Sequence, residues 1–256
     1  MIDNLKPASA AALPCKICGS ATALYGVVDF NKSCHEANGF RLPLSGVPIY
    51  YRRCASCEFV FTDAFDAWSD DEFKMHIYND GYAAVDPDYQ AVRPRNNAEL
   101  VNRLWGPHKA QTAVLDYGGG NDVFCALLRA DGFPVAVTYD PMVPAHARRP
   151  ERKFDLVTCF ETLEHLPDPI GGIGRLLDCV AEPGLVHVST YAQPADFGTV
   201  GVNWWYVAPR NGHVSIFSRQ ALALAFGRHG YNTVSVSDNL HFAFRTLPSF
   251  ADHLGK

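Results

Sequence analysis

The sequence predicts an α/β protein, with a mostly parallel sheet covered by helices on both faces and a small module ahead of it. Three observations support this prediction. Strand-like and helix-like segments alternate from residue 113 onward, a pattern that builds parallel sheets. Two Cys-x-x-Cys pairs precede that region, and a run of glycines follows its first strand-like segment. With 48% hydrophobic and 19% charged residues, the chain can bury a sizeable core, which excludes a disordered protein.

The chain of 256 residues divides into four predicted parts: a disordered leader (1–14), a zinc-binding module (15–62), a helical and aromatic connecting segment (63–110) and a ligand-binding domain (111–256). The leader lacks the basic start and long apolar centre of a signal peptide. No stretch of eighteen apolar residues is present, so we expect no membrane span and a cytoplasmic protein. The net charge, 22 − 27 = −5, makes nucleic acid an improbable partner.

The two cysteine pairs, Cys15 with Cys18 and Cys54 with Cys57, predict a zinc site. Four thiolates satisfy the tetrahedral coordination of Zn²⁺, and such a closed site serves folding rather than catalysis. A dithiol redox site is the alternative for a single pair, and Cys34 or His35 offers a replacement ligand. The module is too small to bury much core, so a metal would supply stability.

Elements of the main domain follow from apolar periodicity and from turn residues. Apolar residues at positions i, i+3, i+4 and i+7, from Ile173 to Val180, predict one helix. Ser218 is the predicted N-cap of another helix, which ends before Gly230. The segment between Asp140 and Phe154 contains three prolines and predicts neither a long helix nor a good strand. The predicted strands are 113–116, 135–139, 154–160, 185–190, a strand around 234–236, and 241–245, and the other predicted helices are 97–105 and 121–130.

A nucleoside-type site is predicted where the first two of these strands end. Asp116 and Tyr117 lead into Gly118, Gly119 and Gly120, and glycines at a strand-to-helix turn let a ligand approach the backbone. Asp140 ends the second strand, where a carboxylate can accept hydrogen bonds from ribose hydroxyls. Its alternative role is to cap the turn before Pro141. The spacing fits neither a dinucleotide fingerprint nor a P-loop.

The segments VLDYGGG, VTYD and FDLVTCFETLEHLPDP resemble the motifs of class I S-adenosylmethionine-dependent methyltransferases over roughly residues 95–246. The two cysteine segments resemble the zinc-binding domain fused to a subgroup that includes sugar C-methyltransferases. This resemblance implies a Rossmann-like sheet with an antiparallel last strand. It also implies that Gly118 and Gly120 line the methionine part of S-adenosylmethionine, that Asp140 holds its ribose, and that Phe160 lies near the transferring methyl group.

Candidate catalytic residues come from two segments that follow later strands of the sheet. His165 lies in ETLEHLPDP, and Tyr206 and His213 lie in NWWYVAPRNGHVSIFS. Histidine titrates near neutral pH and can act as a general base. We predict His213 as the base and His165 as a cofactor-side residue. Structural roles in the core remain open for both, and the two tryptophans of the second segment either form a lid or stack on the acceptor.

These observations predict an S-adenosylmethionine-dependent methyltransferase that acts on a small molecule, such as a sugar or nucleotide sugar. One alternative is a zinc-ribbon protein that binds nucleic acid, but residues 15–62 carry five Lys and Arg against three Asp and Glu, a small surplus. A second alternative is an RNA or protein methyltransferase whose ribbon recruits the substrate. The oligomeric state has no signature in the sequence.

Overall fold

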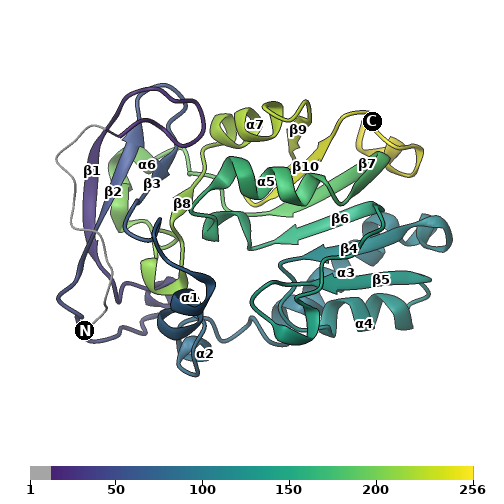
Figure 1. Ribbon diagram of the computed structural model, residues 1–256, viewed down its shortest axis with the longest axis horizontal. Coiled ribbons are helices and arrows are strands. Elements are labelled where there is room, and N and C mark those ends of the chain that lie inside the picture. Colours follow the sequence, from purple (N-terminus) through teal and green to yellow (C-terminus); the bar gives the residue numbers. More distant parts are fainter. Residues whose placement is uncertain (1–12, 256) are drawn as a thin grey trace. The chain divides into compact units, whose positions relative to one another are not determined.

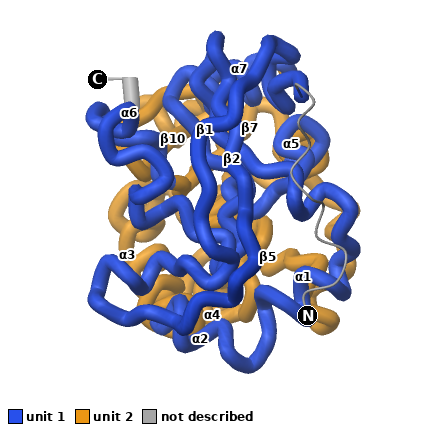
Figure 2. Tube along the Cα trace, turned by 90° about the vertical axis from the view of Figure 1, so that its left-hand side faces the viewer, with its two compact units in different colours: residues 1–87, 163–172, 191–228 blue, residues 88–162, 173–190, 229–256 orange. Residues whose placement is uncertain are grey.

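The computed structural model describes residues 13–255. Most of the predicted leader therefore lies outside the described residues, and its last residue, Pro14, forms an antiparallel bridge with Ala21. The chain forms two compact units, each assembled from separate stretches of sequence (Figure 2). Of the described residues, unit 1 comprises 13–87, 163–172 and 191–228, and unit 2 comprises 88–162, 173–190 and 229–255.

Unit 2 contains a six-stranded sheet in the order β5-β4-β6-β7-β10-β9 (Figure 1). The first four strands are parallel, and β10 is antiparallel to both of its neighbours. The sheet is thus mostly parallel, as the sequence predicts, and it is of the Rossmann-like mixed type. The strands are β4 (Ala113–Tyr117), β5 (Val135–Tyr139), β6 (Phe154–Phe160), β7 (Val180–Ser189), β9 (Asn232–Ser235) and β10 (Leu240–Phe244).

Two helices cover one face of this sheet. α3 (Val92–Trp105) and α4 (Val123–Ala130) contribute Trp105, Phe124 and Leu128 to a core that they share with residues of β4, β6, β7 and β10. α3 begins five residues before its predicted start, with Pro94 in its first turn, where no intrahelical N–H is needed. Within the segment 141–153, where no long element is predicted, the structure forms a single short 3₁₀ turn, η3 (Pro144–His146).

The helix predicted to reach Val180 is shorter than expected. α5 (Pro169–Leu177) ends three residues earlier, and Val180 begins β7, where it pairs with Phe154. Both arrangements bury Val180, so apolar periodicity alone did not distinguish them. α5 crosses the sheet on the side toward the viewer in Figure 1.

Unit 1 contains an antiparallel sheet in the order β1-β2-β3-β8. Three of its strands come from the cysteine-rich segment: β1 (Thr22–Asp29), β2 (Pro48–Cys54) and β3 (Val60–Phe61). The fourth, β8 (Ser215–Ile216), comes from far along the chain and pairs with β3. The Phe59 ring lies 5.1 Å from that of Phe217. The late segment therefore gives the cysteine-rich strands an apolar core that they could not form alone.

Two helices of unit 1 begin at a serine whose side chain caps them. α1 (Asp70–His76) starts with a capping box formed by Ser69 and Glu72, and α7 (Arg219–Gly227) starts at Ser218, whose side chain accepts from the backbone N–H of Ala221. The N-cap predicted at Ser218 is confirmed.

The remaining helical segments of the two units are short: η1 (Cys34–Asn38), α2 (Tyr82–Val85), η2 (Gly106–Gln111), η4 (Leu163–His165), α6 (Phe197–Val200), η5 (Gly201–Asn203), η6 (Pro209–Asn211) and η7 (Ser249–Gly255).

Among residues 13–255, none of the helices has both the length and the hydrophobicity needed to cross a membrane.

Candidate functional site

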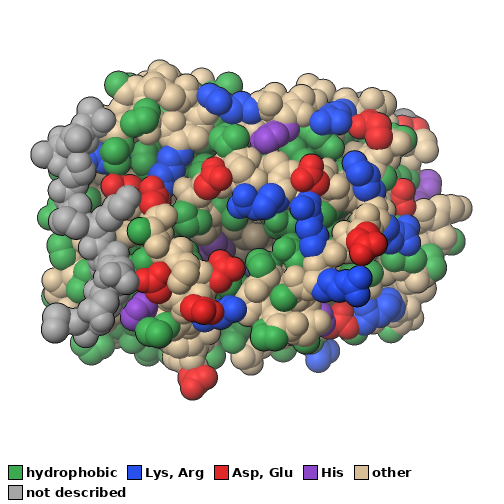
Figure 3. All heavy atoms as spheres, in the orientation of Figure 1, with side chains coloured by type: hydrophobic (Ala, Val, Ile, Leu, Met, Phe, Trp, Pro, Cys, Tyr) green, Lys and Arg blue, Asp and Glu red, His purple; other side chains and the backbone are tan. Residues whose placement is uncertain are grey.

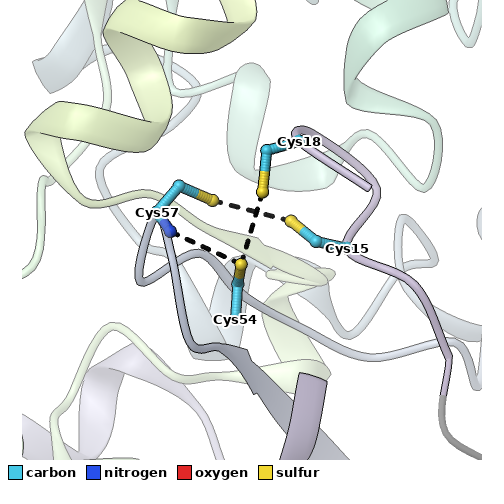
Figure 4. A group of neighbouring side chains, drawn as sticks. All are labelled: Cys15, Cys18, Cys54 and Cys57. Carbon is cyan, nitrogen blue, oxygen red and sulfur yellow. Dashed lines mark hydrogen bonds between the residues drawn. The ribbon is translucent and has the colours of Figure 1, made fainter. Parts of the chain in front are cut away.

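The four paired cysteines lie together in unit 1 (Figure 4). Their sulfur atoms are all within 4.8 Å of one another. The Sγ atoms of Cys15 and Cys57 are 3.6 Å apart, and those of Cys18 and Cys54 are 3.4 Å apart. These separations exclude disulfides, which need about 2.05 Å, and they approach the edge of about 3.8 Å that zinc–sulfur bonds of 2.3 Å would give a tetrahedron.

The local backbone also favours thiolates at this cluster. Backbone N–H groups of Ile17, Ser56 and Cys57 donate to cysteine sulfurs at 3.4 Å. The side-chain hydrogen bond between Cys15 and Cys57 lowers the pKa of the Cys15 thiol and raises the pKa of the Cys57 thiol, and burial raises the pKa of the Cys54 thiol. The backbone donors, rather than these opposed shifts, suit a cation that binds thiolates. Cys34 and His35 are not part of it.

The glycine turn after β4 and the carboxylate after β5 are joined in unit 2. The backbone N–H of Gly120 donates to Oδ2 of Asp140 at 2.8 Å, and that of Met142 donates to Oδ1 at 2.7 Å. Asp140 thus holds both turns, including the one before Pro141. Each of its oxygens retains a second acceptor position, since a carboxylate oxygen has two lone pairs.

The geometry of the turn favours glycine at all three positions, at Gly120 because of its φ of +61°. A Cβ on Gly119 would lie 2.1 Å from Oδ2 of Asp116, and one on Gly118, which has a φ of +76°, would lie 2.5 Å from Oγ1 of Thr162. A Cβ on Gly120 would meet no atom within 4 Å among the described residues, so the backbone at Gly120 is open to a ligand.

The other predicted cofactor residues lie in strands β4 and β6. Asp116 is buried and accepts a hydrogen bond from Oγ1 of Thr158 at 2.7 Å, and burial raises its pKa to about 7. The Tyr117 ring lies 5.2 Å from that of Tyr139. Phe160, the last residue of β6, packs edge-on against His187 with ring centroids 4.8 Å apart. These three residues and the glycine turn all belong to unit 2.

The three candidate catalytic residues lie together in unit 1. The His165 and His213 rings are 5.0 Å apart, and the Tyr206 ring is 4.3 Å from that of His213. Glu164 completes this group, which we call the histidine–glutamate cluster: it is fully buried and accepts a hydrogen bond from the Tyr206 hydroxyl at 2.6 Å. Two segments distant in sequence, η4 and the loop before β8, supply its members.

Hydrogen bonds fix the tautomer of both histidines. Nδ1 of His165 lies 3.1 Å from the carbonyl oxygen of Gly212, and Nδ1 of His213 lies 2.8 Å from that of Tyr206. A carbonyl oxygen can only accept, so each Nδ1 carries the hydrogen in these bonds. In the neutral rings the lone pair is then on Nε2, the nitrogen able to accept a proton or bind a cation.

The tryptophans next to Tyr206 pack as part of an aromatic group. The Trp204 and Trp205 rings lie 5.3 and 5.2 Å from the Tyr206 ring, and Trp204 is buried. Tyr191 contacts both Trp205 and Tyr206. This packing favours the lid-like structural role for Trp204 over stacking on an acceptor.

Glu164 was missed by sequence reasoning. Its signal was present, because it directly precedes His165 in ETLEH, but only the fold brings it to Tyr206, 42 residues away. Thr158, which holds Asp116, was missed as well, because a threonine inside an apolar strand looks like an ordinary strand residue.

The family model described as a methyltransferase domain matches residues 89–236, more than half of the chain. The chain belongs to this methyltransferase family. Of the curated proteins, a ubiquinone biosynthesis O-methyltransferase from Glaesserella parasuis serovar 5 (strain SH0165) is 34% identical over 59 residues, which cover 23% of this chain and 25% of the relative. The chain therefore matches only a quarter of that relative's length.

Solved structures share the fold of this methyltransferase-family protein. An O-methyltransferase family protein from Burkholderia thailandensis superposes with a TM-score of 0.51 at 14% identity, over 70% of this chain and 64% of the other. A mitomycin 7-O-methyltransferase gives 0.50 at 12% identity, over 71% and 61%. At such identities the likeness shows the Rossmann-like methyltransferase fold alone.

Proposed function

We propose that this protein transfers a methyl group from S-adenosylmethionine to a small-molecule acceptor. The observation that carries the proposal is the joined turn in unit 2, where Asp140 holds the backbone of Gly120 at the carboxyl ends of β4 and β5. In open α/β sheets, ligands bind at this edge, and the family match covers all of these residues.

The residues present fit the cofactor. The open backbone at Gly120 leaves room for the methionine part, Gly118 belongs to the same turn, and Asp140 offers acceptor positions to the ribose hydroxyls. Asp116 and Tyr117 support the turn, and Phe160 would face the methyl end. When bound, S-adenosylmethionine supplies a methyl group on a positively charged sulfur, and most of the rate enhancement can come from holding the reactants in line.

The histidine–glutamate cluster is the candidate acceptor side. His165, Tyr206 and His213 bring two imidazoles and a phenol together at buried positions of unit 1. Polar groups arranged in this way suit an acceptor that carries a hydroxyl. We propose a sugar or another hydroxylated small molecule, supported by the resemblance of the cysteine segments and by the O-methyltransferase named above.

We further propose that the four cysteines bind one structural zinc ion. Support comes from the sulfur separations of 3.4 and 3.6 Å and from the three backbone N–H groups that donate to sulfur. Thiolate ligands persist in a reducing compartment, in keeping with a cytoplasmic location.

Nucleic-acid binding has less support. On the face drawn in Figure 3, acidic and basic side chains of the described residues are interspersed rather than gathered into one basic patch. A phosphate backbone needs several contiguous cations for appreciable affinity.

A labelled-methyl assay tests the proposed function. The purified chain is incubated with methyl-labelled S-adenosylmethionine and a panel of nucleotide sugars, phenols and quinols. We expect label in at least one small molecule and S-adenosylhomocysteine as the coproduct. Calorimetry that detects no S-adenosylmethionine binding at millimolar concentration, with the protein folded, would refute the proposal. Label found in RNA or protein instead would refute the small-molecule acceptor.

A further inference from the structure

The histidine–glutamate cluster has the composition of a metal site distinct from the four cysteines. Glu164, His165 and His213 each offer one donor atom, and these atoms all lie within 4.8 Å of one another. We propose that they bind a divalent transition-series cation. All three residues belong to unit 1.

Both histidines are oriented as metal-binding histidines are. Metal-ligating imidazoles donate their second ring N–H to a carbonyl or carboxylate, which fixes the ring and raises its basicity. Nδ1 of His165 does so to Gly212 and Nδ1 of His213 to Tyr206, at 3.1 and 2.8 Å. Nε2 of His165 is in turn 3.9 Å from Oε1 of Glu164. The Nε2 atom of His165 and the carboxylate thus lie close together, and His213 brings one ring nitrogen to the same group.

The carboxylate of Glu164 adds an oxygen donor to the two imidazoles. Glu164 has no exposed surface, and its carboxyl group belongs to the buried part of the cluster. The Tyr206 hydroxyl donates to Oε1 at 2.6 Å and fixes its position. With a cation bound, Tyr206 would act as the outer partner that orients a ligating carboxylate.

The backbone holds the two contributing segments together. The N–H of Val214 donates to the carbonyl oxygen of Glu164 at 2.9 Å, and Oγ of Ser215 donates to that of Leu166 at 2.7 Å. From β2, the buried Tyr51 hydroxyl donates to the carbonyl oxygen of His213 at 2.7 Å. The donors are therefore pre-organised by hydrogen bonds that do not use the ligating atoms.

The donor set selects the class of cation. Two imidazoles and one carboxylate suit Mn²⁺, Fe²⁺, Co²⁺ or Zn²⁺, and three protein ligands leave coordination positions open. Bonds of about 2.1 Å place neighbouring ligands about 3.0–3.5 Å apart. Binding would draw the donors inward from their present spread.

The cation gives the site a role in the proposed methyl transfer, on which this step rests. An acceptor hydroxyl bound at an open position would have its pKa lowered and would lose its proton to water. The acceptor class that follows is an alcohol or phenol.

Mn²⁺ binding to the zinc-loaded protein tests the site. Mn²⁺ disfavours thiolates, so electron paramagnetic resonance of free and bound Mn²⁺ reports on a nitrogen and oxygen site rather than on the cysteines. We expect about one Mn²⁺ per chain, at least 10-fold weaker binding in Glu164→Gln and His213→Gln, and unchanged binding in His35→Gln. His35 is a matched control, because its Nδ1 also lies 3.0 Å from a carbonyl oxygen, that of Ala84, outside the cluster.

Two results would overturn the proposal. One is that folded wild-type protein binds no Mn²⁺ at 1 mM, and the other is that Glu164→Gln binds it as tightly as wild type. If the variants fail to fold, electron spin-echo measurements on Mn²⁺-loaded wild type test the site instead. Histidine ligation requires coupling between the Mn²⁺ electron spin and ¹⁴N, so its absence would overturn the proposal. S-adenosylmethionine affinity is measured separately, so that a failed cation site with intact cofactor binding does not count against methyl transfer.

Discussion

At the scale of single residues, Asp140 shows how one carboxylate can organise a ligand site. It accepts one backbone N–H from the glycine turn and another from Met142, and it thereby holds two turns that follow neighbouring strands. A side chain that is already held by the backbone loses little conformational freedom when a ligand binds.

The first prediction concerns Asp140→Ala. Removing the carboxylate deletes the proposed ribose acceptor and also leaves the N–H of Gly120 without its partner, so S-adenosylmethionine affinity should fall. A hydrogen bond to a charged group is worth about 1.5–3 kcal/mol, which corresponds to roughly 10- to 100-fold in Kd. Calorimetry measures this affinity, with Asp155→Ala as a control, since Asp155 binds the backbone N–H of Ala113 at the other end of β4. Unchanged affinity would reduce Asp140 to a turn residue.

The second prediction concerns His213→Gln. If His213 acts on the acceptor side, its loss should lower turnover about 10²-fold or more while S-adenosylmethionine affinity stays near the wild-type value. Steady-state kinetics and cofactor titration separate the two effects. The same measurements on His165→Gln test the cofactor-side role predicted for His165, which would appear as a loss of S-adenosylmethionine affinity. Full turnover in His213→Gln would mean that catalysis rests on positioning alone.

The third prediction concerns pH and Asp116. Its pKa is raised to about 7 from an unfolded value near 3.9, so the native state holds a proton that the unfolded state releases. The associated stability is fully present below about pH 4 and is lost as pH rises toward 7. The free energy of unfolding of the wild type should therefore fall relative to Asp116→Asn by up to about 1.4 kcal/mol per pH unit across that window. Urea titrations at pH 4, 5.5 and 7 check this, and parallel curves would contradict it.

At the scale of elements, the cysteine cluster is linked to α7 by one side chain. Oγ of Ser218 accepts from the N–H of Ala221 and donates to the carbonyl oxygen of Cys57 at 2.7 Å. The helix cap and the turn that carries Cys57 therefore share the Oγ atom of Ser218. The sheet of unit 1 shows the same dependence, because β3 has only two residues and pairs on one side with β8.

The fourth prediction follows from this shared cap. Ser218→Ala should destabilise unit 1 by about 1–3 kcal/mol, since it removes a cap and leaves a buried carbonyl oxygen with one partner fewer. Ser69→Ala is the matched control, because Ser69 caps α1 at an exposed position and should cost nearer 1 kcal/mol. Urea unfolding midpoints measure both. Equal decreases in the free energy of unfolding for the two variants would show that the hydrogen bond from Ser218 to Cys57 adds no stability.

At the scale of the whole molecule, the chain divides its predicted roles between two units. The glycine turn, Asp116, Asp140 and Phe160 belong to unit 2, whereas the four cysteines and the histidine–glutamate cluster belong to unit 1. Each unit is assembled from several stretches of sequence, so the chain passes between them repeatedly (Figure 2). Site-resolved methods such as hydrogen exchange can measure the local stability of each unit separately.

The fifth prediction concerns the proposed zinc. Cys54→Ser or a strong chelator should remove about one zinc per chain and increase hydrogen exchange in β1 and β2 far more than in β4 and β6, because only the former strands adjoin the cluster. Cys34→Ser is the control, since Cys34 lies outside the cluster and should retain zinc. Elemental analysis and exchange mass spectrometry measure the two effects. Protein purified without chelators that contains no metal would contradict the prediction.

The sequence by itself determined the elements whose signals are local. β5 and β6 have the predicted bounds, and Ser218 caps the predicted helix, because apolar runs and caps depend on a few neighbouring residues. The same holds for the grouping of the four cysteines, whose spacing already implies a common ion. The end of α5 was not determined, since burial of Val180 is compatible with either helix or strand.

Only the tertiary structure decided which distant residues meet. Glu164 reaches Tyr206, His213 lies beside His165, and β8 completes the sheet begun by β1, β2 and β3. None of these contacts has a period or spacing that a sequence can display, because each joins segments more than 40 residues apart. Their formation depends on the burial of the aromatic side chains in both segments, and this apolar packing places a glutamate and two histidines within reach of one cation.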